Sequence, residues 1–266
     1  MLETIWDTAN RRQVERDSPE RAACRATRCL PGEIAPHVLL PGDPGRARLI
    51  AEQYFDNGQL VMANREFHSY TGTYKGLPVS VISTGLGSPG AAMVMQDLPR
   101  LGVRAAIRVG TCGTPDPDLR PGDVIVATGA VRDEGASKKH MPDIFPAVPD
   151  FDLTAALLGA ARTLTDRAAY GLVLTSDGFR YPGLAEESAL YAGAGVRGVD
   201  MECSAIMVLG QVCKVPSACI LSVDGHTGNV AAGKLAPDGE ARDRGIRTAI
   251  TAALDAFVAI GQSHHG

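Results

Sequence analysis

Short runs of apolar, β-branched residues alternate along this chain with longer segments that carry the 3.6-residue apolar period of a helix. Near-continuous apolar strands separated by helices are typical of a parallel sheet covered on both faces. The predicted strands lie at residues 37–40, 79–84, 105–109, 123–127, 171–175, 196–201 and 218–223. The predicted helices lie at residues 44–54, 88–101, 151–164, 184–193, 202–213 and 239–261. The pattern therefore predicts an α/β fold with a mixed, mostly parallel central sheet flanked by helices.

Beyond residue 30, the chain contains no linker, internal repeat or low-complexity tract that would divide it. We therefore expect residues 31–266 to form one domain, which is long enough to bury a stable core without disulfides or metals. Residues 1–30 are charged and lack periodicity, so they predict an N-terminal arm or extension.

Charge and residue usage exclude several classes of partner. With 26 basic and 30 acidic residues, the chain has no basic field for nucleic acid or an anionic membrane. No apolar run approaches the ~18 residues of a membrane helix, and residues 1–26 lack the apolar segment of a signal peptide. The six cysteines form no C-x-x-C pair, and the histidines lack metal-ligand spacing except at the C-terminal end. We expect a reduced, cytoplasmic protein that binds no metal.

Polar and glycine-rich turns follow several of the predicted strands. In open α/β sheets, ligands bind outside the carboxyl ends of the strands. Any one of these turns could exist only to reverse the chain, but five of them together predict one composite pocket. The turns are residues 41–44, 84–87, 110–113, 176–178 and 224–226.

One of these turns, Gly85–Gly90, also matches the G-x-G-x-x-G pattern of a dinucleotide-binding site. Such a site needs an acidic residue about 20 residues later to bind the ribose, and the next predicted strand carries Arg108 instead. The motif also does not open the fold. The pattern is therefore a weak signal, and anion binding by backbone N–H groups is the simpler interpretation.

Three arginines stand beside strand ends or turns: Arg46, Arg65 and Arg108. A guanidinium inside an apolar strand is unfavourable unless it has a partner, so Arg108 is the most informative of them. It could pair with a carboxylate such as Asp43 or Glu66. Alternatively, because guanidinium groups match phosphate oxygens, it could belong to a phosphate clamp.

Six motifs in the same order resemble nucleoside phosphorylase family 1, which contains uridine phosphorylases and hexameric purine nucleoside phosphorylases. The resemblance covers about residues 35–260, and residues 65–67 and 101–113 are more similar to the uridine enzymes. The motifs are residues 42–46, 65–67, 83–87, 101–113 (continuing to 120–124 and 135–137), 176–179 and 200–205.

The resemblance implies phosphorolysis, in which a nucleoside and inorganic phosphate give a free base and ribose 1-phosphate without a metal or organic cofactor. Phosphate would be held by Gly42, Arg46, Arg108 and Thr111. Arg65 would reach the phosphate in a neighbouring subunit, so the resemblance implies a homo-oligomer with shared sites, a dimer within a hexamer.

The resemblance also implies the groups that meet the nucleoside. Met201 and Glu202 would contact the ribose, and Phe179 would lie against the base. Arg108, Glu202 and Asp224 would form the catalytic set, with Asp224 also beside the base. A carboxylate can accept hydrogen bonds from two sugar hydroxyls, and aromatic faces stack on bases, so these residue types suit the roles.

Base recognition is where the sequence departs from both branches of the family. Uridine enzymes carry Gln and Arg just after the segment that corresponds to residues 179–183, where this chain has Leu184 and Glu186. Purine enzymes carry Ser-Asp-His after the last strand, whereas here Asp224 stands one position earlier. We expect a uridine-phosphorylase-like enzyme with relaxed base choice. The alternatives are a purine nucleoside phosphorylase, a nucleosidase that uses water, or a dinucleotide-dependent oxidoreductase.

Overall fold

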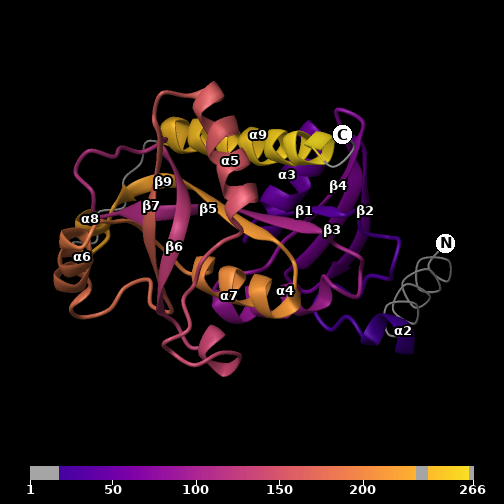
Figure 1. Cartoon of the computed structure of the whole chain (residues 1–266), viewed down its shortest axis with the longest axis horizontal. Helices are drawn as coiled ribbons and strands as arrows, with labels where there is room; N and C mark the ends of the chain where they lie inside the picture. The colour runs from indigo at the N-terminus through magenta and orange to yellow at the C-terminus, as the bar shows by residue number, and fades with distance from the viewer. Residues whose placement is uncertain (1–17, 232–238, 264–266) are drawn as a thin grey trace, which may run out of the picture.

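The strands pair into one mixed sheet in the computed structural model, which describes residues 18–231 and 239–263 (Figure 1). They are β1 (His37–Leu40), β2 (Asp56–Asn64), β3 (Phe67–Tyr74), β4 (Leu77–Ile82), β5 (Ala105–Thr114), β6 (Val124–Asp133), β7 (Ala168–Ser176), β8 (Val196–Asp200) and β9 (Ser217–His226). Their order is β2-β3-β4-β1-β5-β8-β7-β6-β9, and β5 also pairs with β9. The strands β5, β8, β7, β6 and β9 therefore close into a ring.

The central pairings are parallel, as expected. β1 runs parallel to β4 and β5, β5 runs parallel to β9, and β7 runs parallel to β6 and β8. The remaining pairings are antiparallel. The parallel strands form two sets, β4-β1-β5-β9 and β6-β7-β8, which run antiparallel to each other where β5 pairs with β8 and β6 with β9. Within each set the carboxyl ends lie at one edge, and the pairing of Gly113 with Val199 brings the ends of β5 and β8 together.

Helices cover both faces of the sheet, which explains why its strands are apolar throughout (Figure 1). One face packs under α3, α5 and α9, and Ile50, Leu157 and Phe257 are fully buried there. The other face packs on α4 and α7 through residues such as Met95 and Leu209. The helices are α2 (Pro19–Ala22), α3 (Pro44–Tyr54), α4 (Ser88–Asp97), α5 (Phe151–Leu164), α6 (Leu184–Gly193), α7 (Cys203–Cys213), α8 (Thr227–Ala231) and α9 (Gly239–Ser263), with a 3-10 turn at Ser137–Lys139.

The β2–β3 hairpin is the main element that the apolar pattern did not predict. β2 has apolar residues only at positions 60–63 and most of its side chains are exposed, while β3 is rich in Ser, Thr and Tyr. Neither strand therefore shows the buried, near-continuous apolar run of the central strands. Such an antiparallel pair can face water on one side, and tertiary pairing with β4 decides its conformation.

The N-terminal segment is described only from residue 18, so most of the expected arm lies outside the described residues. The part that is described packs into the domain: Cys24, Ala26 and Cys29 are fully buried. The Asp97 carboxylate, at the end of α4, accepts hydrogen bonds from the backbone N–H groups of Ala26 and Thr27 at 3.1 and 2.8 Å. These residues belong to the core instead of lying on the surface. Within the described residues, no helix is both long and apolar enough to cross a membrane.

Candidate active site

A cavity of about 620 Å³ opens where the carboxyl ends of the strands meet. All five polar segments that the sequence marked contribute to its wall, which confirms the expectation of a composite pocket. Two of them, residues 110–113 and 224–226, are not turns, because they continue β5 and β9. Their contributions are Gly42, Gly85, Gly110, Gly178 and Asp224. The predicted site residues on the wall are Gly42, Arg46, Arg108, Thr111, Phe179, Met201, Glu202 and Asp224.

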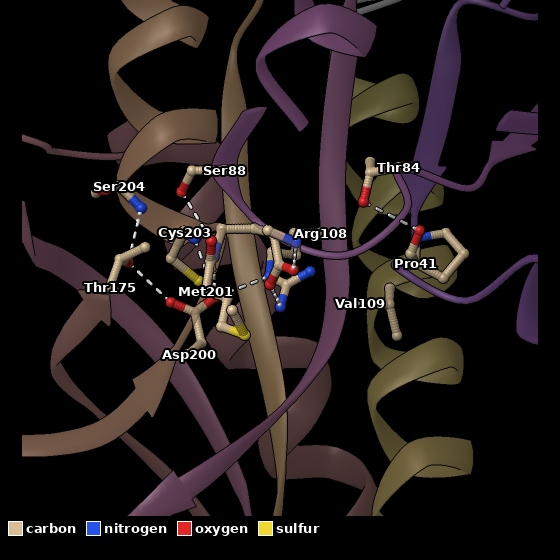
Figure 2. A network of polar contacts seen from close by, with 12 residues as sticks. Pro41, Thr84, Ser88, Arg108, Val109, Thr175, Asp200, Met201, Cys203 and Ser204 are labelled. Carbon is tan, nitrogen blue, oxygen red and sulfur yellow. Dashed lines mark hydrogen bonds and ion pairs between the residues drawn. The ribbon is translucent and has the colours of Figure 1, made fainter. Parts of the chain in front are cut away.

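Arg108 is held deep in this wall, with only 3% of its surface exposed. Its Nε donates to Asp200 Oδ2 at 3.0 Å, and its Nη2 donates to Glu202 Oε2 at 2.5 Å (Figure 2). Burial acts to lower the pKa of Arg108, but the Glu202 and Asp200 carboxylates outweigh it and raise that pKa above its ordinary value. The guanidinium is therefore a permanent positive charge with a fixed orientation.

The carboxylates that hold Arg108 differ from the two that the sequence suggested. Asp43 caps α3, where its side chain accepts hydrogen bonds from the N–H groups of Gly45 and Arg46. Glu66 lies on the cavity wall, but the carboxylates that bind Arg108 are those of Asp200 and Glu202. The actual partners, Asp200 and Glu202, lie at or just after the end of β8, some ninety residues from Arg108 in sequence. They contact Arg108 only in the folded chain, so the sequence alone did not identify them.

Glycine residues let the backbone and Arg108 approach each other closely. A Cβ atom on Gly110 would lie 2.6 Å from Arg108 Nη2 and 2.7 Å from Leu221 Cδ2. On the opposite side, a Cβ atom on Gly42 would lie 3.1 Å from the carbonyl oxygen of Gly85. Side chains at either position would intrude on the wall of the cavity, so these glycines shape the site.

Arg46 brings a second positive charge to the same wall. It lies in the first turn of α3, and its Nη1 donates to the Val109 carbonyl oxygen at 3.4 Å. Burial and the nearby positive charge of Arg108 lower the pKa of Arg46. The positive charges of the two guanidinium groups repel each other, so an anion placed between them stabilises both.

Glu202 faces the cavity from the start of α7. Its Oε1 accepts a hydrogen bond from the Gly87 N–H at 2.6 Å, while its Oε2 binds Arg108. Burial raises the pKa of Glu202, although Arg108 opposes that effect. Each carboxylate oxygen has two lone pairs, so each of these oxygens retains one acceptor site for a hydroxyl group.

Asp224 lies near the end of β9 and lines the cavity. Burial raises the pKa of its carboxyl to about 6, and Arg242 and Arg46 only partly oppose the effect. Near neutral pH this side chain can therefore hold or release a proton. Phe179, at the rim, is 58% exposed, and the Arg180 guanidinium lies 5.9 Å from the centre of its ring.

Arg65 is the one predicted site residue that does not line this cavity. It lies exposed at the tip of the β2–β3 hairpin with a φ of 53°, in the left-handed region. Its neighbour Glu66 does line the cavity. The hairpin therefore presents Arg65 to the outside of its own subunit.

Several wall residues were missed by the sequence reasoning. Thr227 and Asn229 lie in α8, directly after β9, and Arg242 lies near the start of α9. Their only sequence signal was the polar turn at residues 224–226, and nothing in the pattern brought α9 to that turn. No group of His, Cys, Asp and Glu side chains in the described parts of the chain is arranged to hold a metal ion.

Comparison with known proteins agrees with this geometry. The family model described as "Phosphorylase superfamily" matches residues 36–259. The chain is 41% identical over 204 residues to uridine phosphorylase from Treponema pallidum (strain Nichols), covering 73% of this chain and 79% of that protein. It is 35% identical over 195 residues to guanosine phosphorylase from Halorubrum lacusprofundi, covering 73% and 80%.

The fold is also shared with a solved structure. The crystal structure of uridine phosphorylase from Vibrio fischeri ES114 superposes with a TM-score of 0.82 and 29% identity, covering 88% of this chain and 95% of that one. By its matched family model, by these relatives and by the fold that it shares with them, the chain belongs to the phosphorylase superfamily.

Proposed function

We propose that this protein is a nucleoside phosphorylase, a pentosyltransferase that cleaves a nucleoside with inorganic phosphate and prefers uridine. One observation carries the proposal: Arg46 and Arg108 converge on a cavity beside Glu202, so an anion site and a hydroxyl-binding carboxylate are adjacent. The uridine preference is supported by the 41% identity to a uridine phosphorylase.

In this reaction, phosphate attacks the anomeric carbon as the glycosidic bond breaks. The sugar gains the positive charge of an oxocarbenium ion, and the leaving base gains negative charge. Arg46 and Arg108 would hold phosphate in line for attack, with Gly42 and Thr111 completing the phosphate site. The bound phosphate then acts as both nucleophile and counter-charge, so catalysis comes from positioning and electrostatics.

The ribose would lie against Met201 and Glu202. Glu202 has one acceptor site left on each carboxylate oxygen, which suits two adjacent hydroxyls of a sugar. The Met201 backbone is held in place because its carbonyl oxygen accepts a hydrogen bond from Ser88 Oγ at 2.7 Å. The exposed ring of Phe179 would cover the base at the mouth of the cavity.

The proposed reaction uses no organic cofactor and no metal, since phosphate supplies the nucleophile. We further propose a cytoplasmic protein, in keeping with six cysteines that are all free thiols, five of them buried. Because Arg65 is exposed and does not line its own cavity, we propose that it completes the site of a neighbouring subunit. The smallest active unit is then a dimer, within a closed hexamer.

A panel of nucleosides assayed with and without phosphate tests the proposed reaction. Uridine, inosine and guanosine are incubated with the protein, and free base and ribose 1-phosphate are quantified. We expect base release that requires phosphate and yields ribose 1-phosphate in equal amount. Base release without phosphate would identify a nucleosidase, and no release from any nucleoside would refute the proposal.

Purine cleavage is the second candidate, and Asp224 is the observation that favours it. A purine leaves more readily when an acid protonates N7, and a carboxyl with a pKa of about 6 can supply that proton. In Asp224→Asn we expect uridine cleavage to persist and inosine cleavage to fall. A strong inosine preference that collapses in Asp224→Asn would instead make the protein a purine enzyme.

A further inference from the structure

Behind the cavity wall lie three polar side chains that no substrate can reach. Thr175, at the end of β7, and Ser204, in the first turn of α7, are fully buried, and Glu134, after β6, is 2% exposed. None of them lines the cavity. Burying polar groups is unfavourable unless their hydrogen bonds are made, so their arrangement is informative.

Thr175 connects the two parts of the site. Its Oγ1 donates to Asp200 Oδ1 at 2.8 Å and accepts from the Ser204 N–H at 3.0 Å (Figure 2). A hydroxyl has one proton to donate, a carboxylate only accepts, and an amide N–H only donates. The direction of both hydrogen bonds is therefore determined by the partners.

Asp200 connects Thr175 to Arg108 through its two carboxylate oxygens. Its other oxygen, Oδ2, accepts from Arg108 Nε at 3.0 Å and from the N–H groups of Glu202 and Cys203 at 3.1 and 2.9 Å. Rotation about the terminal torsion of an aspartate is broad when nothing restrains it. The bond from Thr175 to Oδ1 restricts that rotation together with the three donors on Oδ2, and so helps to keep Oδ2 directed at Arg108 and at the start of α7.

Ser204 anchors the same helix start from its other side. Its Oγ donates to Glu134 Oε1 at 2.9 Å, and Glu134 Oε2 accepts from the Ser137 N–H at 2.9 Å. The first turn of α7, which begins beside Glu202, is thus tied both to Thr175 and to Glu134. The Thr175 hydroxyl therefore contacts both Asp200, which orients Arg108, and the first turn of α7, which positions Glu202.

We infer that Thr175 is a positioning residue that orients Arg108 through Asp200 and Glu202 through the first turn of α7. The inference rests on the proposed function of the cavity, because it assigns Arg108 to phosphate and Glu202 to ribose. It extends that function to a side chain that touches neither substrate. A residue with a purely structural role would affect stability and leave binding unchanged.

The test compares Thr175→Val, which keeps the shape and removes both hydrogen bonds, with Thr175→Ser, which keeps the hydroxyl. Thr154→Val is the matched control, since Thr154 is also buried and its Oγ1 donates to the Asp150 carbonyl oxygen on α5, outside the cavity wall. For each protein, phosphate affinity is measured by calorimetry, kcat and both KM values by base release, and Tm by thermal unfolding.

In Thr175→Val we expect phosphate to bind about 2-fold to 10-fold more weakly and kcat to fall as well. This is less than the loss of a hydrogen bond made directly to a charged ligand, because the bond from Thr175 to the Asp200 carboxylate acts on phosphate only through Arg108. Both KM values should rise, because both supports are loosened. Thr175→Ser should stay within about 2-fold of the wild type. Thr154→Val should lose Tm while keeping wild-type kinetics and phosphate affinity.

Three results would overturn the inference. They are a Thr175→Val protein that loses Tm but binds phosphate normally, a Thr175→Ser protein as impaired as Thr175→Val, and a wild-type protein that binds no phosphate. Thr175→Ala replaces Thr175→Val if the latter does not fold, and failure of both to fold would assign Thr175 to the fold alone. If the wild type cleaves no nucleoside yet phosphate affinity falls only without the hydroxyl, the proposed function fails while the positioning role stands.

Discussion

At the scale of a single residue, Arg108 shows how a buried positive charge can be held in a fixed position on the wall of a binding cavity. Its guanidinium is nearly enclosed, and two carboxylates fix its orientation. These ion pairs do not make the protein stable by themselves, because burying three charges offsets much of their attraction. Their effect is to keep a rigid cation at one place on the cavity wall, where a mobile surface arginine would not stay.

Replacing Arg108 with lysine should distinguish the effect of its fixed orientation on phosphate binding from the effect of its positive charge. Arg108→Lys keeps a positive charge but cannot reach Asp200 and Glu202 with two directed N–H groups. We expect its kcat/KM for phosphate to fall about 10-fold to 100-fold, as for a lost hydrogen bond to a charged group. Steady-state kinetics with varied phosphate measure the effect, and unchanged phosphate dependence would contradict the clamp.

The lysine variant is preferred to Arg108→Ala for a physical reason. Removing the cation leaves the Asp200 and Glu202 carboxylates buried without their partner, which costs about 3–5 kcal/mol and can unfold the protein. Thermal unfolding of both variants serves as the control, and we expect a much larger loss of Tm in Arg108→Ala.

Asp224 gives a prediction about pH and stability. Its folded pKa of about 6 exceeds the value of about 3.9 for an unfolded aspartate. Between these pH values the folded chain binds a proton that the unfolded chain has lost, so stability falls as pH rises from about 4 to about 6. Asp224→Asn removes this dependence. The Tm of the wild type should therefore drop relative to that of Asp224→Asn across this range, and parallel curves would contradict the assignment.

At the scale of elements, the strand ends and the turns after them build the site. The Gly85–Gly90 turn illustrates how local sequence can suggest the wrong ligand. The N–H of Gly87 donates to Glu202, and a Cβ on Gly90 would lie 2.3 Å from the Thr84 carbonyl oxygen. The glycines thus serve close packing of α4 and support of Glu202. Membership of the phosphorylase superfamily agrees with this and not with the dinucleotide-dependent alternative.

Gly110, in β5, offers a test at this scale. Gly110→Ala would place a methyl group against the Arg108 guanidinium and Leu221, so Arg108 must move. We expect phosphate affinity to fall about 10-fold or more, because the charged hydrogen bonds of Arg108 are displaced. Calorimetric titration with phosphate measures it.

Gly159→Ala is the control for Gly110→Ala. Gly159 lies within α5, and apart from the neighbouring residues and backbone of its own helix no described atom is within 4 Å of the position of its added Cβ. This change should leave phosphate affinity unaltered and slightly raise Tm, since alanine favours a helix over glycine. Equal phosphate affinity in Gly110→Ala and Gly159→Ala would show that the strand tolerates the methyl group and that Arg108 is not displaced.

At the scale of the whole molecule, the proposed sharing of sites can be tested by mixing two defective subunits. Arg65→Ala and Arg108→Lys should each be weakly active alone. If Arg65 serves a neighbour, a mixed dimer contains one site with both arginines intact, so random mixing should restore activity at about a quarter of all sites. The two variants are unfolded, mixed, refolded together and assayed.

The control for the mixing experiment refolds each variant alone. Activity in the mixture that merely averages the two controls would show that Arg65 does not act across subunits. Sedimentation under assay conditions provides a second check, since an active monomer would contradict a shared site.

The sequence alone determined the class of fold and most of its parts. Every predicted helix and every apolar strand has its counterpart, because near-continuous apolar runs and 3.6-residue periods follow from burial on the sheet faces. The five polar, glycine-rich segments also predicted where the cavity lies, since ligands bind at the carboxyl ends of strands and these segments stand at such ends. These features depend on local residue patterns, which the chain carries in itself.

Only the tertiary structure decided the partners and the geometry of the site. The β2–β3 hairpin, in which β2 is mostly exposed and β3 is rich in polar residues, forms through pairing with β4. Arg108 pairs with Asp200 and Glu202, not with the acidic residues nearer in sequence, because the closed ring of strands brings the end of β8 beside β5. Contacts between residues far apart in the chain depend on strand order and closure, and no local pattern encodes these.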